Sequence, residues 1–145
     1  FYRSQHELVF VFKVGTVGHI NNFGLGGRGR YRSNVWVYPG VNTFKRGRMA
    51  ELEAHPTVKP LAMVVDALKD CSRRSGVVLD PFLGSGTTLL AAEKTGRVGR
   101  GIEFDPHYVD VAVRRWQEMT GEGAVHLESG LTYEQLAAQR GALVK

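Results

Sequence analysis

Beyond residue 56 the apolar positions recur with the spacing of helices and short strands. Apolar side chains three and four residues apart predict a helix that begins near Pro60 and ends before Gly76. The stripe that this helix would bury comprises Leu61, Val64, Val65, Leu68 and Cys71. We therefore expect the helix to pack on a core through one face, with Cys71 as a small buried residue.

Two short apolar runs alternate with helical patterns downstream. Residues 77–80 and 101–104 have the length and composition of strands, and a glycine-containing turn at 81–86 follows the first of them. Residues 87–95 predict a helix that ends at Gly96.

Capping residues mark the last two helices. Asp105 followed by Pro106 is typical of a helix start. Thr132 and Gln135 have the spacing of a capping box at the start of another helix. The order helix–strand–helix–strand–helix predicts an α/β fold with a parallel sheet and right-handed crossovers.

The first third of the chain lacks this regularity. The run 8–12 is rich in β-branched and aromatic residues and predicts a largely buried strand. Residues 15–55 are rich in glycine and show no helical period, with one candidate short strand at 34–38. Irregular segments of this length are usually functional or disordered.

Composition narrows the class of protein. The chain has 145 residues, of which 43% are hydrophobic and 23% charged, so one domain with its own core is expected. No apolar run reaches the roughly 18–20 residues of a membrane span. A single cysteine excludes an intrachain disulfide framework. Residues 1–14 have no signal-peptide pattern. Because the chain starts at Phe1 rather than Met, we expect it to be a piece of a longer protein or a processed one.

The net charge of +5 is concentrated at the front of the chain. Residues 1–60 hold nine Lys and Arg against three Asp and Glu, a net charge of +6, and the remainder is near neutral. This distribution favours a segment that faces a polyanion, carried on a globular platform. Scattered arginines on an ordinary basic protein are the alternative.

The turn between the first expected strand and the next helix holds the candidate chemistry. Gly84 and Gly86 let the backbone approach a ligand at a helix N-terminus, and Glu103 closes the second expected strand, where an acid can accept both ribose hydroxyls. Diphosphate-binding patterns do not fit, because no lysine follows Gly86 and Leu89 stands where a third glycine is needed. Asp80 favours a cofactor with a positive or amino-acid group, such as S-adenosyl-L-methionine. A tight turn without a ligand is the structural alternative.

Three motifs make the interpretation more specific. They read His-Pro-Thr-Val-Lys-Pro at 55–60, Asp-Pro-Phe-Leu-Gly-Ser-Gly-Thr-Thr at 80–88 and Gly-Ile-Glu-Phe-Asp-Pro-His-Tyr at 101–108. In this order they resemble the C-terminal half of the amino-methylating DNA methyltransferases, in the permuted arrangement where the catalytic part precedes the cofactor part. The resemblance implies a Rossmann-like, S-adenosylmethionine-dependent fold with a parallel-rich sheet, incomplete at its N-terminus.

The same resemblance divides the chain into three parts. Residues 1–14 would be a strand of the catalytic half, residues 15–55 a basic, glycine-rich segment that recognises DNA, and residues 56–145 the S-adenosylmethionine-binding half. Enzymes of this kind methylate the exocyclic nitrogen of adenine or cytosine, and we favour adenine.

By position in the motifs, the resemblance implies a cofactor site made of the turn and its neighbours. Asp80 would face the methionine amino group, Glu103 would hold the ribose, and the two phenylalanines of the site would pack on the cofactor. The full set is Thr57, Lys59, Pro60, Asp80, Phe82, Gly84, Gly86, Thr87, Thr88, Glu103 and Phe104. Helix capping is the alternative role for Thr57 and Pro60, and exposure to solvent for Lys59.

The catalytic signature of this family is Asp, Asn or Ser followed by Pro-Pro and an aromatic residue, and it does not occur in the chain. Asp80-Pro81-Phe82 has one proline and belongs to the cofactor turn. In the family the signature binds the target amino group and stacks on the flipped base. We therefore assign no catalytic residue, and we expect the chain alone to be inactive. We assign no metal ligand either, because His19, His55, His107 and His126 lack the spacing of one.

A cationic segment at 28–48 contains no acid and has aromatic residues interleaved. Lysine and arginine neutralise phosphates, and aromatic rings stack on bases. The resemblance places target-recognition elements in this region, so we assign DNA contacts to Arg28, Arg30, Arg32, Trp36, Lys45, Arg46 and Arg48. The alternative is a solvated loop whose Trp36 and Tyr38 pack on the core.

The sequence thus predicts part of a site-specific DNA methyltransferase that uses S-adenosyl-L-methionine and binds double-stranded DNA. We expect a cytoplasmic protein without a membrane partner, in a setting such as restriction–modification, and leave the oligomeric state open, a dimer included. Two alternatives remain: a DNA- or cofactor-binding module without chemistry, and a methyltransferase that acts on RNA or a small molecule.

Overall fold

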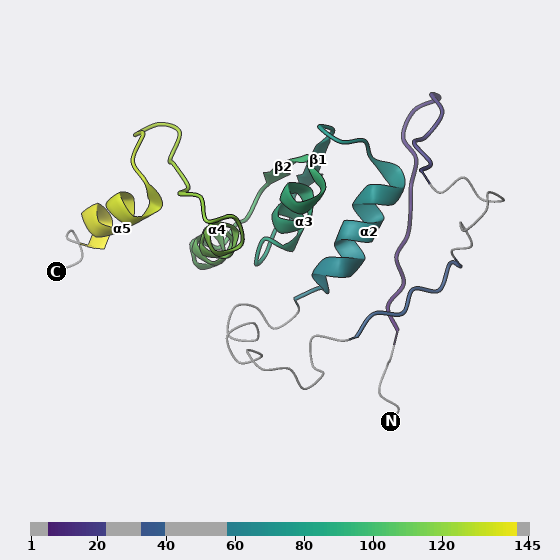
Figure 1. The fold of residues 1–145 in the computed structure, drawn as a ribbon, viewed down its shortest axis with the longest axis horizontal. Helices are drawn as coiled ribbons and strands as arrows, with labels where there is room; N and C mark the ends of the chain where they lie inside the picture. Colours follow the sequence, from purple (N-terminus) through teal and green to yellow (C-terminus); the bar gives the residue numbers. More distant parts are fainter. Residues whose placement is uncertain (1–5, 23–32, 40–57, 142–145) are drawn as a thin grey trace.

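The computed structural model describes residues 6–22, 33–39 and 58–141 (Figure 1). Its helices and strands are α2 (Leu61–Cys71), β1 (Val77–Asp80), α3 (Thr87–Thr95), β2 (Val98–Gly101), α4 (Pro106–Thr120) and α5 (Tyr133–Gly141). The predicted order of elements in the second half of the chain is confirmed. None of the described helices has the length and apolar composition needed to cross a bilayer.

β1 and β2 form a parallel pair, and α3 is the crossover between them. Val77 lies opposite Val98, and Asp80 lies opposite Gly101. The second strand is therefore 98–101, upstream of the predicted 101–104. The main-chain N–H of Val98 already donates to Gly76 O at 2.9 Å, so pairing starts as soon as the chain leaves α3.

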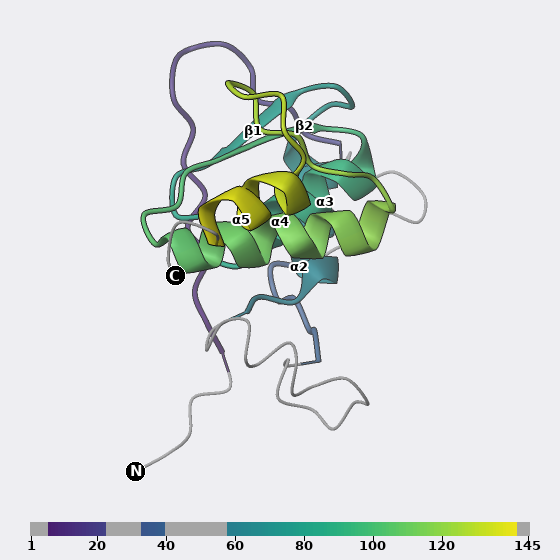
Figure 2. The ribbon, with the colours of Figure 1, turned by 90° about the vertical axis from the view of Figure 1, so that its left-hand side faces the viewer.

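The core lies between this sheet and the helices on one side of it (Figure 2). The buried hydrophobic residues of the described chain are Val65, Leu90, Ala91, Ala92, Val111 and Ala112. Three of them belong to α3, which packs between α2 and α4. A Cβ at Gly99 would lie 2.7 Å from the Leu89 side chain, so small residues let α3 sit directly on β2.

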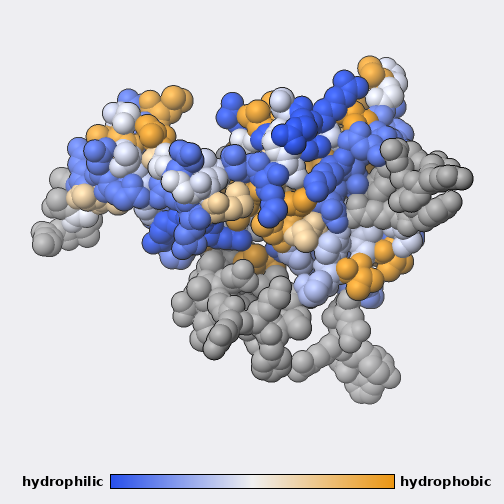
Figure 3. Space-filling view, in the orientation of Figure 1, coloured by the Kyte–Doolittle hydropathy of each residue, from blue (hydrophilic) through white to orange (hydrophobic). Residues whose placement is uncertain are grey.

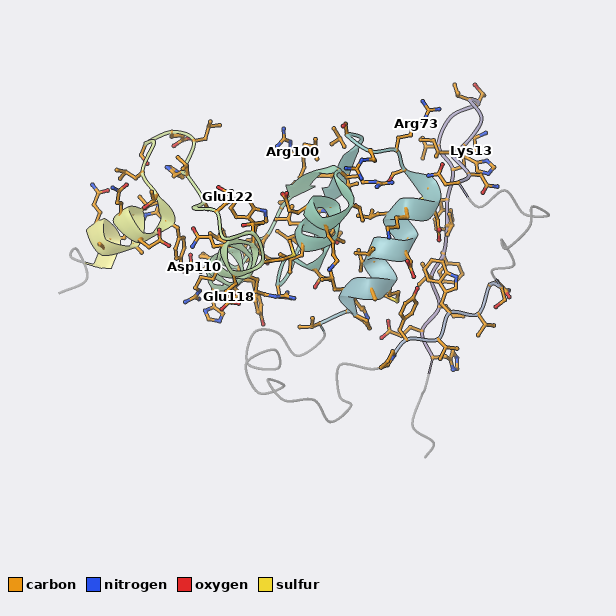
Figure 4. All side chains as sticks on the ribbon, viewed as in Figure 1. Lys13, Arg73, Arg100, Asp110, Glu118 and Glu122 are labelled. Atoms are coloured by element: carbon orange, nitrogen blue, oxygen red, sulfur yellow. The ribbon has the colours of Figure 1, made fainter. Side chains whose placement is uncertain are left out.

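The opposite face of the sheet is apolar and bare in the described chain. Val77 is 69% exposed, Leu79 62% and Ile102 59%. Arg100, opposite Leu79, projects from the same face (Figure 4). In the space-filling view, apolar patches reach the surface between polar ones (Figure 3). Parallel sheets are normally covered on both faces, and within the part of the chain that the structure describes the helices cover one of them.

Arg97 ties the ends of α2 and α3 together. Its guanidinium donates to Ser72 O at 2.8 Å and to Thr95 O at 2.6 Å. Both carbonyls lie at helix C-termini, where no intrahelical donor is available. One side chain thus fixes the spacing of the two helices beside the sheet.

The predicted helix caps are confirmed. Asp105 Oδ1 accepts from His107 N at 2.9 Å at the start of α4. Gln135 N donates to Thr132 Oγ1 at 3.3 Å, and Thr132 N donates to Gln135 Oε1 at 2.9 Å, which is a reciprocal capping box.

α5 contacts α4 through polar side chains. Gln117 Nε2 donates to Glu134 Oε1 at 2.8 Å, and this hydrogen bond lowers the pKa of the Glu134 carboxyl. Burial, reinforced by the nearby negative charge of Asp110, raises the pKa of the Tyr133 hydroxyl. Both shifts report contact between the two helices and lie away from the turn after β1.

The buried strand predicted at 8–12 is wrong. Residues 6–14 form no strand, and Phe10 is 73% and Phe12 84% exposed. The segment runs beside α2, which separates it from the sheet (Figure 1). Glu7 attaches it through an ion pair with Lys59 at 2.5 Å. Further along the chain, Asn22 donates from Nδ2 to carbonyls at the end of α2. With α2 in between, the edges of β1 and β2, the strands that the structure describes, are out of reach for pairing.

Two smaller expectations also fail. Residues 34–38 form no strand; instead the Tyr38 hydroxyl donates to Asp66 Oδ2 at 2.5 Å on α2, and the Trp36 ring lies edge-on to the Tyr38 ring. Cys71, the last residue of α2, is exposed rather than buried. The division of the chain at residues 14 and 55 stays a prediction.

Candidate functional site

The turn from Asp80 to Gly86 leads from β1 into α3 through two left-handed glycines. The φ angle is 54° at Gly84 and 84° at Gly86, values that residues with a Cβ rarely adopt. Gly86 is also the N-cap of α3, and no side chain of the described residues caps this helix. The first-turn amides of α3 are therefore available to a ligand.

Asp80 shapes the beginning of the turn. Its carboxylate Oδ1 accepts from Phe82 N at 3.0 Å, and its main-chain oxygen accepts from Ile102 N at 2.9 Å. The latter bond continues the β1–β2 ladder past the last strand residue. Asp80 is half-buried at the carboxyl end of β1, where the sequence predicts an acid beside the ligand.

Glu103 joins the turn to the start of α4. Its carboxylate accepts from Gly84 N at 2.6 Å through Oε2 and from Asp105 N at 3.0 Å through Oε1. Glu103 lies two residues beyond β2 rather than at its end. The structure thus brings together the acid and the glycine turn that the sequence analysis paired.

Gly86 has a packing role that needs no ligand. A Cβ at this position would lie 2.7 Å from Ala112 Cβ and 3.0 Å from Ala112 Cα. α4 therefore presses against the back of the turn, and glycine is required there for both its φ angle and its size. This contact with Ala112 explains the glycine at position 86 by packing alone, and it leaves room for a ligand role of the same residue.

Arg115 is a residue of the site that sequence reasoning missed. Its Nη1 donates to Ser85 O at 2.5 Å and to Ser85 Oγ at 2.8 Å, and lies 3.5 Å from Thr87 Oγ1. Ser85 and Thr87 are 5% and 8% exposed, so the Thr87 hydroxyl points toward α4. The sequence signal that could have identified Arg115 is its spacing. It follows Ala112 by three residues, so both lie on the same face of α4.

The remaining predicted cofactor residues differ in exposure. Phe82 and Phe104 are 90% and 100% exposed, beside the turn. Thr88 is half-buried in the first turn of α3. Pro60 is the N-cap of α2, and Lys59 is engaged with Glu7.

Most of the predicted DNA-contacting residues lie outside the described residues, and so does Thr57. These residues are Arg28, Arg30, Arg32, Lys45, Arg46 and Arg48. Trp36 is described and half-buried, with its ring against Tyr38 and on the α2 side of the molecule. Within the described ranges, no three His, Cys, Asp or Glu residues are grouped so as to hold a metal ion.

A family model described as DNA methylase, covering the N6 and N4 methyltransferases, matches residues 2–114. The chain therefore belongs to the family of amino DNA methyltransferases that modify N6 or N4. The resemblance seen in the three sequence motifs is confirmed.

Individual relatives agree with this assignment. The chain is 45% identical over 87 residues to the type II methyltransferase M.ScaI of Streptomyces caespitosus, covering 60% of this chain and 29% of the relative. It is 35% identical over 119 residues to the type II methyltransferase M.HpaI of Haemophilus parainfluenzae, covering 77% and 35%. It is 42% identical over 82 residues to the DNA adenine methyltransferase YhdJ of Escherichia coli, covering 57% and 26%.

The chain spans between about a quarter and a third of the length of these curated relatives. Among solved structures, the complex of M1.HpyAVI with SAM aligns with a TM-score of 0.42 and 40% identity, over 43% of this chain and 30% of that one. The family assignment rests on the sequence match.

The close approach at Gly86 gives a prediction for stability. Gly86→Ala introduces both a left-handed alanine and an overlap with Ala112, and should lower the free energy of unfolding by about 3 kcal/mol. Gly121→Ala is the matched control, because its φ is 75° but a Cβ there meets nothing within 4 Å, so about 1 kcal/mol is expected. Urea denaturation measures both. Equal losses at the two positions would show that the overlap with α4 is unimportant.

Proposed function

We propose that this chain forms the S-adenosyl-L-methionine-binding part of an enzyme that methylates an exocyclic amine of a DNA base. The observation that carries the proposal is the contact of the Glu103 carboxylate with Gly84 N at 2.6 Å, beside a helix N-terminus without a side-chain cap. Membership of the DNA methylase family supports it.

The chemistry of the turn suits this methyl donor. Asp80 offers a carboxylate for the ammonium group, and the Glu103 carboxylate offers acceptor oxygens of the kind that ribose hydroxyls donate to. The first-turn amides of α3 and the positive end of its dipole suit the methionine carboxylate. The negative charges of Asp80 and Glu103 at the same edge of the sheet disfavour binding of a diphosphate. The absence of a lysine after Gly86 also argues against a diphosphate.

The exposed aromatic side chains suit the adenine end of the same donor. Phe82 and Phe104 lie on the two loops that follow β1 and β2. Their rings are almost wholly accessible to solvent, so a flat heterocycle between or against them would remove apolar surface from water. When bound, the donor would supply the activated methyl group.

Methyl transfer to an amine is an in-line displacement, so catalysis is largely a matter of positioning. In this proposal Asp80, Glu103 and the glycine turn bind and orient the donor, and the acceptor amine is held by groups that this chain does not contain. Adenine is the favoured base, and the adenine specificity in the name of the relative YhdJ supports it. The type II methyltransferases among the relatives support a restriction–modification setting.

Donor binding is tested by titration calorimetry with S-adenosylhomocysteine. The native chain should bind, and Glu103→Ala should weaken binding by roughly 10- to 100-fold because hydrogen bonds to a charged group are lost. Glu103→Gln, which keeps one acceptor oxygen, should be intermediate. Glu118→Ala, an exposed acid on α4, is the control (Figure 4). No binding by the native chain would contradict the proposal.

The missing Pro-Pro signature predicts that the chain binds donor without catalysing transfer. Incubation of residues 1–145 with labelled S-adenosyl-L-methionine and duplex DNA should incorporate no label above the protein-free rate. A full-length type II methyltransferase on the same DNA is the positive control. Incorporation of label by this chain would refute the prediction that catalysis needs the missing Pro-Pro signature. Donor binding without incorporation of label also fits a binding module that has no chemistry of its own.

DNA binding by the segment at 28–48 has its own test. Neutralising Arg28, Arg30 and Arg32 together should weaken duplex binding and reduce the slope of log K against log salt by up to about 3. A matched control neutralises Lys13, Arg73 and Arg100, which makes the same change in charge at described surface positions (Figure 4). Equal effects of the two sets would dismiss a specific role for the segment. Stronger competition by structured RNA than by duplex DNA would favour an RNA substrate.

A further inference from the structure

Arg115 contacts the turn at Ser85, the residue next to the Gly84 amide that donates to Glu103. It is carried by α4, 30 residues from its partner Ser85, and its guanidinium meets both the carbonyl and the hydroxyl of that one residue. Ser85 is only 5% exposed, so neither oxygen has ready access to water. A buried carbonyl without a hydrogen-bond donor destabilises the folded state. We therefore expect the backbone at Ser85 to rotate if the guanidinium is removed.

The carbonyl held by this guanidinium belongs to a connected series of peptide planes. Ser85 O and Gly86 N share one plane, and Gly86 N donates to Leu83 O at 3.1 Å. Leu83 O and Gly84 N share another, and Gly84 N donates to Glu103 Oε2 at 2.6 Å. Each plane is thus held at both ends, and a rotation at Ser85 changes the direction of the amide that meets the carboxylate.

We infer that Arg115 is a positioning residue for the methyl-donor turn, acting through these two peptide planes on Glu103. This deepens the proposed function and rests on it. Packing alone does not account for the contact, because Ala112 already supports the back of the turn at Gly86. The guanidinium fixes the orientation of the Ser85 carbonyl, which packing does not, because a charged donor forms short, directional hydrogen bonds.

The test compares Arg115→Gln with Arg114→Gln, its exposed neighbour on the same helix. Titration with S-adenosylhomocysteine, well below the melting temperature of each protein, should give a Kd raised about tenfold for Arg115→Gln and unchanged for Arg114→Gln. Arg115→Lys, which offers one ammonium in place of the fork, should recover part of the loss. A lower melting temperature with an unchanged Kd would overturn the inference, because that is the result of a merely structural role.

Amide hydrogen exchange gives a second readout that needs no cofactor. Gly84 and Gly86 should exchange about tenfold faster in Arg115→Gln, while amides within β1 and α3 keep their native protection. If the native chain fails to bind S-adenosylhomocysteine, the proposed function fails, and exchange alone decides whether Arg115 orients the turn. Unchanged exchange at both glycines overturns the inference.

A milder variant covers the case in which Arg115→Gln does not fold. Ser85→Ala removes the hydroxyl acceptor and leaves the carbonyl contact, so its Kd should rise by only about threefold. Arg115→Lys and Ser85→Ala then carry the same two measurements. Native values of both Kd and exchange in these two variants would reject the inference.

Discussion

The parallel pairing of β1 with β2 is the constraint on which the site depends. It places Asp80 opposite Gly101, so both strands finish at one edge and their following loops lie side by side. Leu83 N and Ile102 O extend the contact into the loops at 3.0 Å. With antiparallel strands the two acids that flank the turn would stand at opposite ends of the sheet.

The turn itself is held by contacts at three consecutive residues. Gly84 N donates to the Glu103 carboxylate, the Ser85 carbonyl accepts from Arg115, and Gly86 packs on Ala112, the last two partners being on α4. α4 is therefore more than a covering helix, because it determines both the space at Gly86 and the orientation of the next carbonyl. A preorganised turn of this kind loses little freedom when a ligand binds, which supports the proposal of a donor site at this turn.

The second half of the chain was largely predictable from sequence. The helix that ends at Gly96 and the reciprocal capping of Thr132 and Gln135 follow from interactions over three or four residues. The prediction of a strand at 8–12 was wrong because a strand depends on a partner that is distant in the sequence. The composition of this apolar run suits a strand, but strand formation needs a partner edge, and α2 stands between this run and the sheet.

By itself the sequence determined the order of elements, the glycine turn with its two acids and the membership of the amino DNA methyltransferases. Those features depend on local capping, on backbone freedom and on residue identity. Only the tertiary structure decided that Glu103 meets Gly84 across 19 residues and that Arg115 meets Ser85 across 30. Such contacts depend on how α4 returns to the sheet edge, and that path is set by packing around α3, which no local pattern encodes.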